Sequence, residues 1–253
     1  MKNFNKSILT LIIFALITSC QEGQKSKTES TVEIESQKAV LKQTPTREKV
    51  LTSEEQKALT PEQIIEILKE GNRRFTKNDL TQRDHSAMVR DAAKGQFPKA
   101  VVLSCLDSRV PVEDVFDRGI GDIFVGRIAG NFANTDLLGS MEYGCKVSGA
   151  KVILVLGHQY CGAIKSAIDN VKLGNITSML EKIKPAVDKS QSFVGEKSSK
   201  NDAFVEFESR NNVLNTIETI RSKSPILKLM EKNGEIKIIG ATYNLQTGIV
   251  YFF

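Results

Sequence analysis

The sequence has no tryptophan, only two histidines and only four cysteines in 253 residues. Its most apolar segment, ILTLIIFALI at residues 8–17, is too short for a transmembrane helix, which needs about 20 residues. The net charge of +5 is scattered, without a basic stripe or interleaved aromatic residues, so nucleic acid is not an expected partner. Three cysteines remain beyond Cys20, and this odd number argues against a disulfide framework.

The first twenty residues have the features of an export signal. Lys2 and Lys6 precede the apolar segment, which ends in ITSC, with small residues before Cys20. This end resembles a bacterial lipobox, which predicts a lipoprotein signal peptide over residues 1–19 and lipidation at Cys20. Several acyl chains anchor a protein to a membrane that it does not span. We therefore expect a lipid-anchored protein of the bacterial cell envelope; the alternative is an ordinary secretory leader, in which Cys20 is incidental.

A polar segment follows at residues 20–53, rich in Lys, Glu, Ser, Thr and Gln. Such a composition buries too little apolar surface to offset the entropy of ordering, so we expect a flexible, lipidated tether. The remaining residues 54–253 have the size of one α/β domain.

Within this domain, continuous apolar strands alternate with helical patterns. This alternation predicts an α/β fold with a mainly parallel central sheet flanked by helices, and a C-terminal hairpin at the sheet edge. An exposed edge strand is often covered by a partner, which is a first indication of a dimer. The predicted strands are 99–105, 122–130, 151–158, 235–244 and 247–253, and the predicted helices are 60–78, 84–94, 136–149, 161–172, 175–187 and 202–223.

The two most apolar strands both end in possible metal ligands. Cys105 follows VVLS, while His158 and Cys161 follow VILVLG. Ligands of open parallel sheets lie at the carboxyl ends of the strands. Two thiolates and an imidazole suit zinc, and three protein ligands leave one tetrahedral position open, as in a catalytic site. Cys145 and His85 are the only other candidates, and neither has a ligand-like spacing.

Each ligand also has a structural alternative. A buried cysteine is usually a small apolar residue, which is the expected role of Cys145. Cys105 and Cys161 could instead form a disulfide, and His158 alone could be a hydrogen-bonded core residue. The joint placement of the three residues beside Asp107 and Arg109 favours the metal site, because a disulfide explains only the two cysteines.

CLDSR, followed about fifty residues later by GHQYCGA, resembles the signature of the β-class carbonic anhydrases, and the resemblance extends over residues 60–253. It implies one zinc ion per chain, held by Cys105, His158 and Cys161. Zinc-bound hydroxide then hydrates carbon dioxide reversibly to bicarbonate and a proton. The resemblance also implies that Arg109 holds Asp107, which orients the hydroxide, and that Asp107 becomes the fourth zinc ligand in a closed form of some members.

The same resemblance implies further pocket residues. These are Gln96, Phe124, Ala129, Tyr143 and Gly162. Because the neighbouring subunit supplies some of them in the family, it also implies a homodimer or a multiple of dimers. Some members regulated by bicarbonate have tryptophan where this chain has Val102, so we do not expect that regulation here.

Two other functions remain open from the sequence. One is a zinc hydrolase of a molecule similar to carbon dioxide, such as carbon disulfide or carbonyl sulfide. The other is a non-catalytic, zinc-containing envelope lipoprotein whose zinc is structural or whose cysteines pair.

Overall fold

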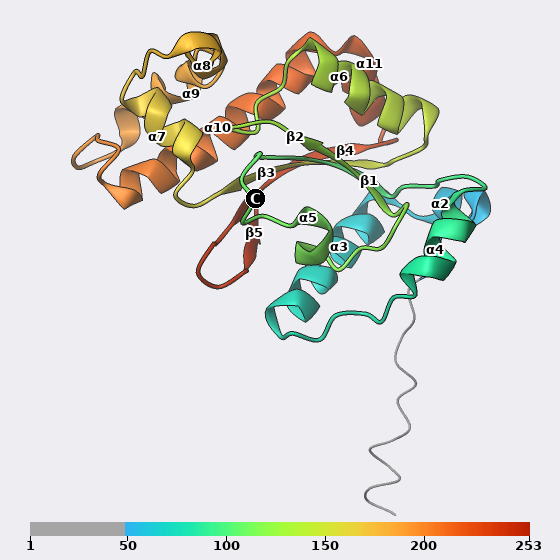
Figure 1. Ribbon diagram of the computed structural model, residues 1–253. Coiled ribbons are helices and arrows are strands. Elements are labelled where there is room, and N and C mark those ends of the chain that lie inside the picture. Colours follow the sequence, from blue (N-terminus) through green and yellow to red (C-terminus); the bar gives the residue numbers. More distant parts are fainter. Residues whose placement is uncertain (1–48) are drawn as a thin grey trace, which may run out of the picture. The chain divides into compact units, whose positions relative to one another are not determined.

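The structure is a computed structural model that describes residues 49–253. The predicted signal peptide, Cys20 and most of the predicted tether lie outside the described residues. The centre of the domain is a five-stranded sheet in the order β2-β1-β3-β4-β5, in which only β5 runs antiparallel to its neighbour (Figure 1). The strands are β1 Ala100–Ser104, β2 Ile123–Arg127, β3 Val152–His158, β4 Lys237–Tyr243 and β5 Val250–Phe252. The predicted α/β class, parallel sheet and C-terminal hairpin are confirmed.

The helices follow local signals in the sequence. Thr60 caps α3 and forms a reciprocal capping box with Gln63, and Pro61 occupies the first helical position. A second capping box at Thr52 starts α2 one residue before the predicted start of the domain. The helices are α2 Ser53–Ala58, α3 Pro61–Thr76, α4 His85–Ala92, α5 Val112–Val115, α6 Thr135–Glu142, α7 Gly162–Ile168, α8 Gly174–Leu180, α9 Lys184–Val187, α10 Asp202–Lys223 and α11 Pro225–Lys232, with a π-helical turn at Tyr143–Val147 and a 3₁₀ turn at Ser190–Ser192.

The described helices differ from the predicted ones in several places. The predicted helix at 175–187 is split into α8 and α9, because Pro185 has no backbone N–H with which to continue a helix. The short helices α2, α5 and α11 were not predicted. Ser224 caps α11 and Pro225 opens it, so the signal for this helix is present in the sequence.

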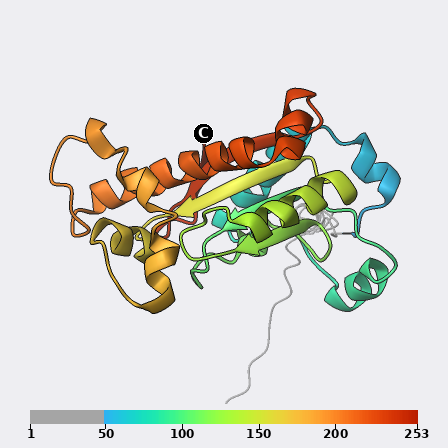
Figure 2. The same cartoon turned by 90° about the horizontal axis from the view of Figure 1, so that it is seen from above.

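Side chains from alternate positions of the strands enter two different cores. Val102 of β1 packs on one face of the sheet with Ile64 and Leu68 of α3. Val101 and Leu103 pack on the other face, which is covered by α6, α10 and α11. The predicted buried residues of α10 are all in contact with the core: Val205, Val213, Ile217 and Ile220. Figure 2 shows α10 running along the sheet from the side of α7–α9 toward α11.

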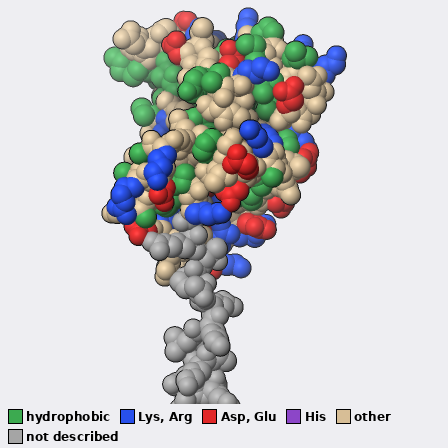
Figure 3. Space-filling view, turned by 90° about the vertical axis from the view of Figure 1, so that its right-hand side faces the viewer, with side chains coloured by type: hydrophobic (Ala, Val, Ile, Leu, Met, Phe, Trp, Pro, Cys, Tyr) green, Lys and Arg blue, Asp and Glu red, His purple; other side chains and the backbone are tan. Residues whose placement is uncertain are grey.

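A third core lies at the carboxyl ends of the strands. It contains Cys105 and Cys161 together with Ile164 of α7, Val205 of α10, and Ile183, the N-cap of α9. On the face shown in Figure 3, Lys and Arg side chains are interspersed with Asp and Glu. Between residues 49 and 253, no helix has both the length and the apolar character needed to cross a bilayer.

Candidate metal centre

The strand order brings the predicted ligands together. β1 lies between β2 and β3, so the chain passes from β1 to β2 on one side and then crosses back to β3 on the other side. Such a switch in direction opens a crevice at the carboxyl ends of the strands. Ser104 pairs with Leu156 in the register of β1 and β3, which places Cys105 and His158 at neighbouring strand ends. Cys161 follows three residues after His158 and is the N-cap of α7.

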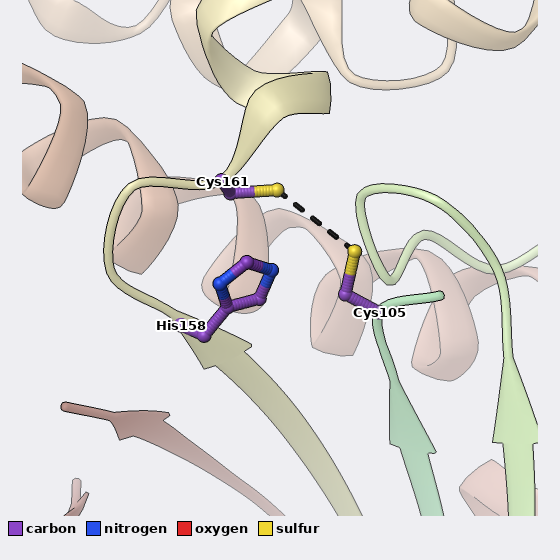
Figure 4. Close-up of side chains that lie close together, drawn as sticks. All are labelled: Cys105, His158 and Cys161. Carbon is purple, nitrogen blue, oxygen red and sulfur yellow. Dashed lines mark hydrogen bonds between the residues drawn. The ribbon is translucent and has the colours of Figure 1, made fainter. Parts of the chain in front are cut away.

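The three side chains converge on one buried point. The Sγ atoms of Cys105 and Cys161 and a ring nitrogen of His158 all lie within 4.8 Å of one another. All three residues are at most 4% exposed. Figure 4 shows the cysteines approaching from two different segments, with their Sγ atoms 4.0 Å apart and the imidazole beside them. In the described part of the chain, this is the only group of three or more residues with metal-ligand geometry.

The backbone orients the imidazole of His158. Its Nδ1 lies 2.7 Å from the carbonyl oxygen of Gln159. Because a carbonyl oxygen can only accept, Nδ1 carries a hydrogen and donates a hydrogen bond to it. Nε2 is buried and has no hydrogen-bond partner. An imidazole with one nitrogen fixed by a carbonyl and the other free is the usual arrangement of a histidine metal ligand. His158 therefore suits a metal ion better than a purely structural role.

The two thiols are not equivalent. The hydrogen bond with Cys161 lowers the pKa of Cys105, and His158 and the backbone N–H of Gly130 lower it further. Cys161 has its pKa raised by the adjacent Cys105 and by burial. The Gly130 N–H donates to Sγ of Cys105 over 3.3 Å. The site thus favours a thiolate at Cys105, and a cation between the sulfurs would favour a second at Cys161.

Asp107 and Arg109 form a dyad beside the ligands. Oδ1 of Asp107 accepts from the backbone N–H and Nε–H of Arg109 at 3.0 and 2.9 Å, and Oδ2 accepts from Nη2–H at 2.7 Å. This hydrogen-bonded guanidinium lowers the pKa of Asp107 to about 2. Asp107 is thus held by Arg109 as an anion, and it is not a member of the three-ligand group.

Arg127 also belongs to the site, although the sequence did not single it out. It ends β2, and its guanidinium donates to the carbonyl oxygens of Cys105 and Asp107, the first bond being 3.0 Å long. It therefore fixes the loop that carries both the first ligand and the dyad. The available signal was its position at the end of the strand adjacent to β1.

The other predicted pocket residues are divided between two places. Ala129 precedes Gly130, and Gly162 follows Cys161 at the start of α7, so both lie next to the ligands. Gln96 is exposed and precedes the amino end of β1, at the opposite end of the strand from Cys105. Phe124 pairs with Val101 in the amino half of β2. These positions separate Gln96 and Phe124 from the metal ligands of their own chain.

Tyr143 accompanies Phe124 rather than the ligands. It is 55% exposed, and both aromatic residues line a cavity of about 600 Å³ whose lining includes none of the three ligands. The two remaining candidates have structural positions. Cys145 is buried in the apolar core, which raises its pKa to about 12, and His85 is exposed at the start of α4. The prediction of Cys145 as a small core residue is confirmed.

Comparison with known proteins agrees with this geometry. Residues 100–250 match the sequence profile of the family described as carbonic anhydrase. Carbonic anhydrase 2 of Mycobacterium tuberculosis is 35% identical over 190 residues, which cover 72% of this chain and 87% of that protein. The β-carbonic anhydrase of Coccomyxa, solved in complex with acetazolamide, is 26% identical with a TM-score of 0.60, over 66% of this chain and 77% of that one.

A second solved structure has the same fold at lower identity. A tetrameric β-carbonic anhydrase of Sordaria macrospora is 19% identical with a TM-score of 0.60, over 66% of this chain and 86% of that one. The family profile, the relatives and the Cys-His-Cys group agree with one another. The chain therefore belongs to the β-class carbonic anhydrase family, whose members are lyases.

Proposed function

We propose that this protein catalyses the reversible hydration of carbon dioxide to bicarbonate and a proton, with one zinc ion held by Cys105, His158 and Cys161. The observation that carries the proposal is the convergence of these three ligand atoms within 4.8 Å at two neighbouring strand ends. Two sulfurs and one imidazole nitrogen are typical zinc donors. No fourth histidine, cysteine or carboxylate joins the group among the described residues, as suits a catalytic site with one open position.

Zinc, when bound there, supplies a Lewis acid that lowers the pKa of a coordinated water to about 7. Asp107 can orient a hydrogen-bond donor that lies next to its carboxylate. Because its pKa is about 2, its carboxylate accepts hydrogen bonds and does not donate them at neutral pH. This carboxylate would accept the hydrogen of a hydroxide held next to it and so would favour the orientation in which the oxygen lone pairs are free to meet carbon dioxide.

Arg109 keeps Asp107 available for this role. The bidentate contact and the backbone N–H of Arg109 fix both the plane and the charge of the carboxylate. In this arrangement Asp107 remains with Arg109, so a role as fourth zinc ligand would need these bonds to break. His85 is exposed on α4 and distinct from the ligand group, so we expect buffer to carry the product proton.

We further propose that the working form is a homodimer or a multiple of dimers. Gln96, Phe124 and Tyr143 do not lie beside the ligands of their own chain, and a second subunit could present them to the partner's site. β2 is an edge strand, and its apolar residues are only half-buried. A partner on this edge would cover them and the adjoining cavity.

The proposed location rests on the sequence outside the described residues. The apolar segment at 8–17 and ITSC before Cys20 support a lipid anchor in the bacterial cell envelope. Mass spectrometry of the N-terminal peptide of the native protein tests this proposal. We expect cleavage before Cys20 and an acylated Cys20; an unmodified Cys20 within a longer chain would contradict it.

The reaction is tested by stopped-flow measurement of carbon dioxide hydration with zinc-loaded protein, with carbon disulfide and carbonyl sulfide as alternative substrates. We expect fast turnover of carbon dioxide that depends on zinc. Turnover of the sulfur compounds alone would favour a hydrolase of molecules similar to carbon dioxide. Loaded protein that turns over none of the three would support a structural metal site.

A further inference from the structure

Three residues connect α10 with the first cysteine ligand. The side-chain amide of Asn212 donates through Nδ2 to the carbonyl oxygen of Gly130 over 2.7 Å. The N–H of Gly130 donates to Sγ of Cys105 over 3.3 Å. Asn212 is completely buried, and Gly130 and Cys105 are buried as well. A helix on the far side of the site is thereby linked to the sulfur by two consecutive hydrogen bonds.

The connecting turn is held in an unusual backbone conformation. Gly130 and Asn131 have φ values of 81° and 37°, both in the left-handed region. The Asn131 N–H donates to the carbonyl of Ile128 over 3.0 Å, so the peptide group between Gly130 and Asn131 is bonded at both its N–H and its oxygen. A side chain at Gly130 would meet Ile183, since a Cβ there would lie 2.3 Å from Cδ1 of that residue.

Holding this peptide group determines where the Gly130 N–H points. The amide and the carbonyl of one residue are separated by only two rotatable bonds, so fixing the carbonyl restricts the directions of the amide. Thr216, one helical turn after Asn212, donates to the next carbonyl, that of Asn131, at 3.3 Å. Asn212 thus holds the carbonyl of the residue that contacts the sulfur, and Thr216 holds the carbonyl after it.

We propose that Asn212 is a positioning residue of the metal centre, which keeps the Gly130 N–H on the sulfur of Cys105. A hydrogen bond to a thiolate withdraws charge from the sulfur, which then donates less charge to a bound metal ion. The ion remains a stronger Lewis acid, as the reaction requires. This inference rests on the proposed function, since it assumes that Cys105 binds a metal ion.

The test uses the full-length protein loaded with Co²⁺, whose sulfur-to-cobalt charge-transfer absorption reports the electron density on the thiolates. Asn212→Leu keeps a similar volume and removes the donor. We expect its charge-transfer band to move to longer wavelength than in the wild type. Thr216→Val is the matched control on the same helix face, and its band should stay in place. An unshifted band in folded Asn212→Leu, or equal shifts in both variants, would overturn the proposal.

A measurement on the wild type does not depend on whether the variant folds. In protein loaded with ¹¹³Cd²⁺, the N–H···S bond should produce a scalar coupling between the Gly130 amide proton and the metal. Absence of this coupling in the loaded protein would overturn the proposal. Failure of the proposed metal site would give another result. Wild-type protein without such a site would show no charge-transfer band at all, whereas failure of the role of Asn212 leaves the wild-type band present and that of the variant unshifted.

Discussion

Oδ2 of Asp107 lies 3.8 Å from Nε2 of His158. The same carboxylate is bound in a bidentate manner by Arg109, while Nε2 has no hydrogen-bond partner. The carboxylate therefore lies close to the point on which the three ligand atoms converge, but it is not hydrogen-bonded to the imidazole. Asp107 would therefore lie close to a metal ion held by Nε2 and the two sulfurs.

Asp107→Asn should reduce carbon dioxide hydration by about 10²-fold or more, because an amide can donate a hydrogen bond and no longer enforces one orientation of the hydroxide. Zinc content should not change, since Asp107 is not among the three ligands. Stopped-flow kinetics and metal analysis of the same samples check both statements. Asp114→Asn, at an exposed position that contacts Arg83, is the control. A fully active Asp107→Asn protein would remove the role assigned to this carboxylate.

Metal removal should make Cys105 and Cys161 sensitive to oxidation. Their sulfurs are 4.0 Å apart, compared with about 2.05 Å in a disulfide, so a small movement suffices for bonding once no ion separates them. We expect chelated protein exposed to oxidised glutathione to form a Cys105–Cys161 disulfide faster than zinc-loaded protein. Peptide mapping measures the product, and Cys161→Ser should abolish it. Equal rates with and without zinc would show that the metal does not protect the thiols.

Glu208 of α10 predicts a dependence of stability on pH that is separate from catalysis. Burial raises its pKa to about 7, and Asn211 and Lys197 offset this effect only in part. An unfolded glutamate ionises near pH 4.3, so the folded chain holds a proton between about pH 4.3 and 7 that the unfolded chain has lost. The free energy of unfolding should therefore fall as pH rises through this range, by an amount on the order of 3 kcal/mol.

Glu208→Gln isolates this effect. The variant and the wild type should unfold at similar urea concentrations near pH 4, whereas the variant should be the more stable one at pH 8. Glu206→Gln, at an exposed position on the same helix, should follow the wild type at both values. An identical pH dependence in the wild type and in Glu208→Gln would contradict the raised pKa of this carboxyl.

A mixture of two variants, each of which we expect to be inactive alone, can show whether Gln96 acts across a subunit interface. Cys105→Ala lacks a metal ligand, and Gln96→Ala lacks the predicted pocket amide. In a mixed dimer, the intact ligands of the Gln96→Ala subunit would meet the intact Gln96 of the other subunit, so activity should return after unfolding and refolding the two together. If Gln96 acts within its own chain, the mixture should be no more active than its components.

Much of the fold was predictable because its signals are local. The capping box at Thr60, the continuous apolar strands and the spacing of buried residues on α10 all correspond to the structure. The metal ligands were predictable because each follows a strong strand signal, and parallel strands align their carboxyl ends.

Other features depend on contacts between distant segments. Nothing near Asn212 indicates that its amide reaches Gly130, 82 residues away. Arg127 contacts two backbone carbonyls, which leave no pattern in the side chains of a sequence. The distance of Gln96 from the ligands of its own chain required the direction of β1 and the strand register.

In the proposed function, carbon dioxide hydration requires one zinc ion held by Cys105, His158 and Cys161. The most direct measurement is a titration of zinc into metal-free, reduced protein, with the hydration rate followed at each addition. We predict that the rate rises in proportion to bound zinc and stops rising at one ion per chain, and that His158→Ala shows no such rise. Full activity in the metal-free protein, or zinc binding at one ion per chain without activity, would contradict zinc-dependent hydration at this site.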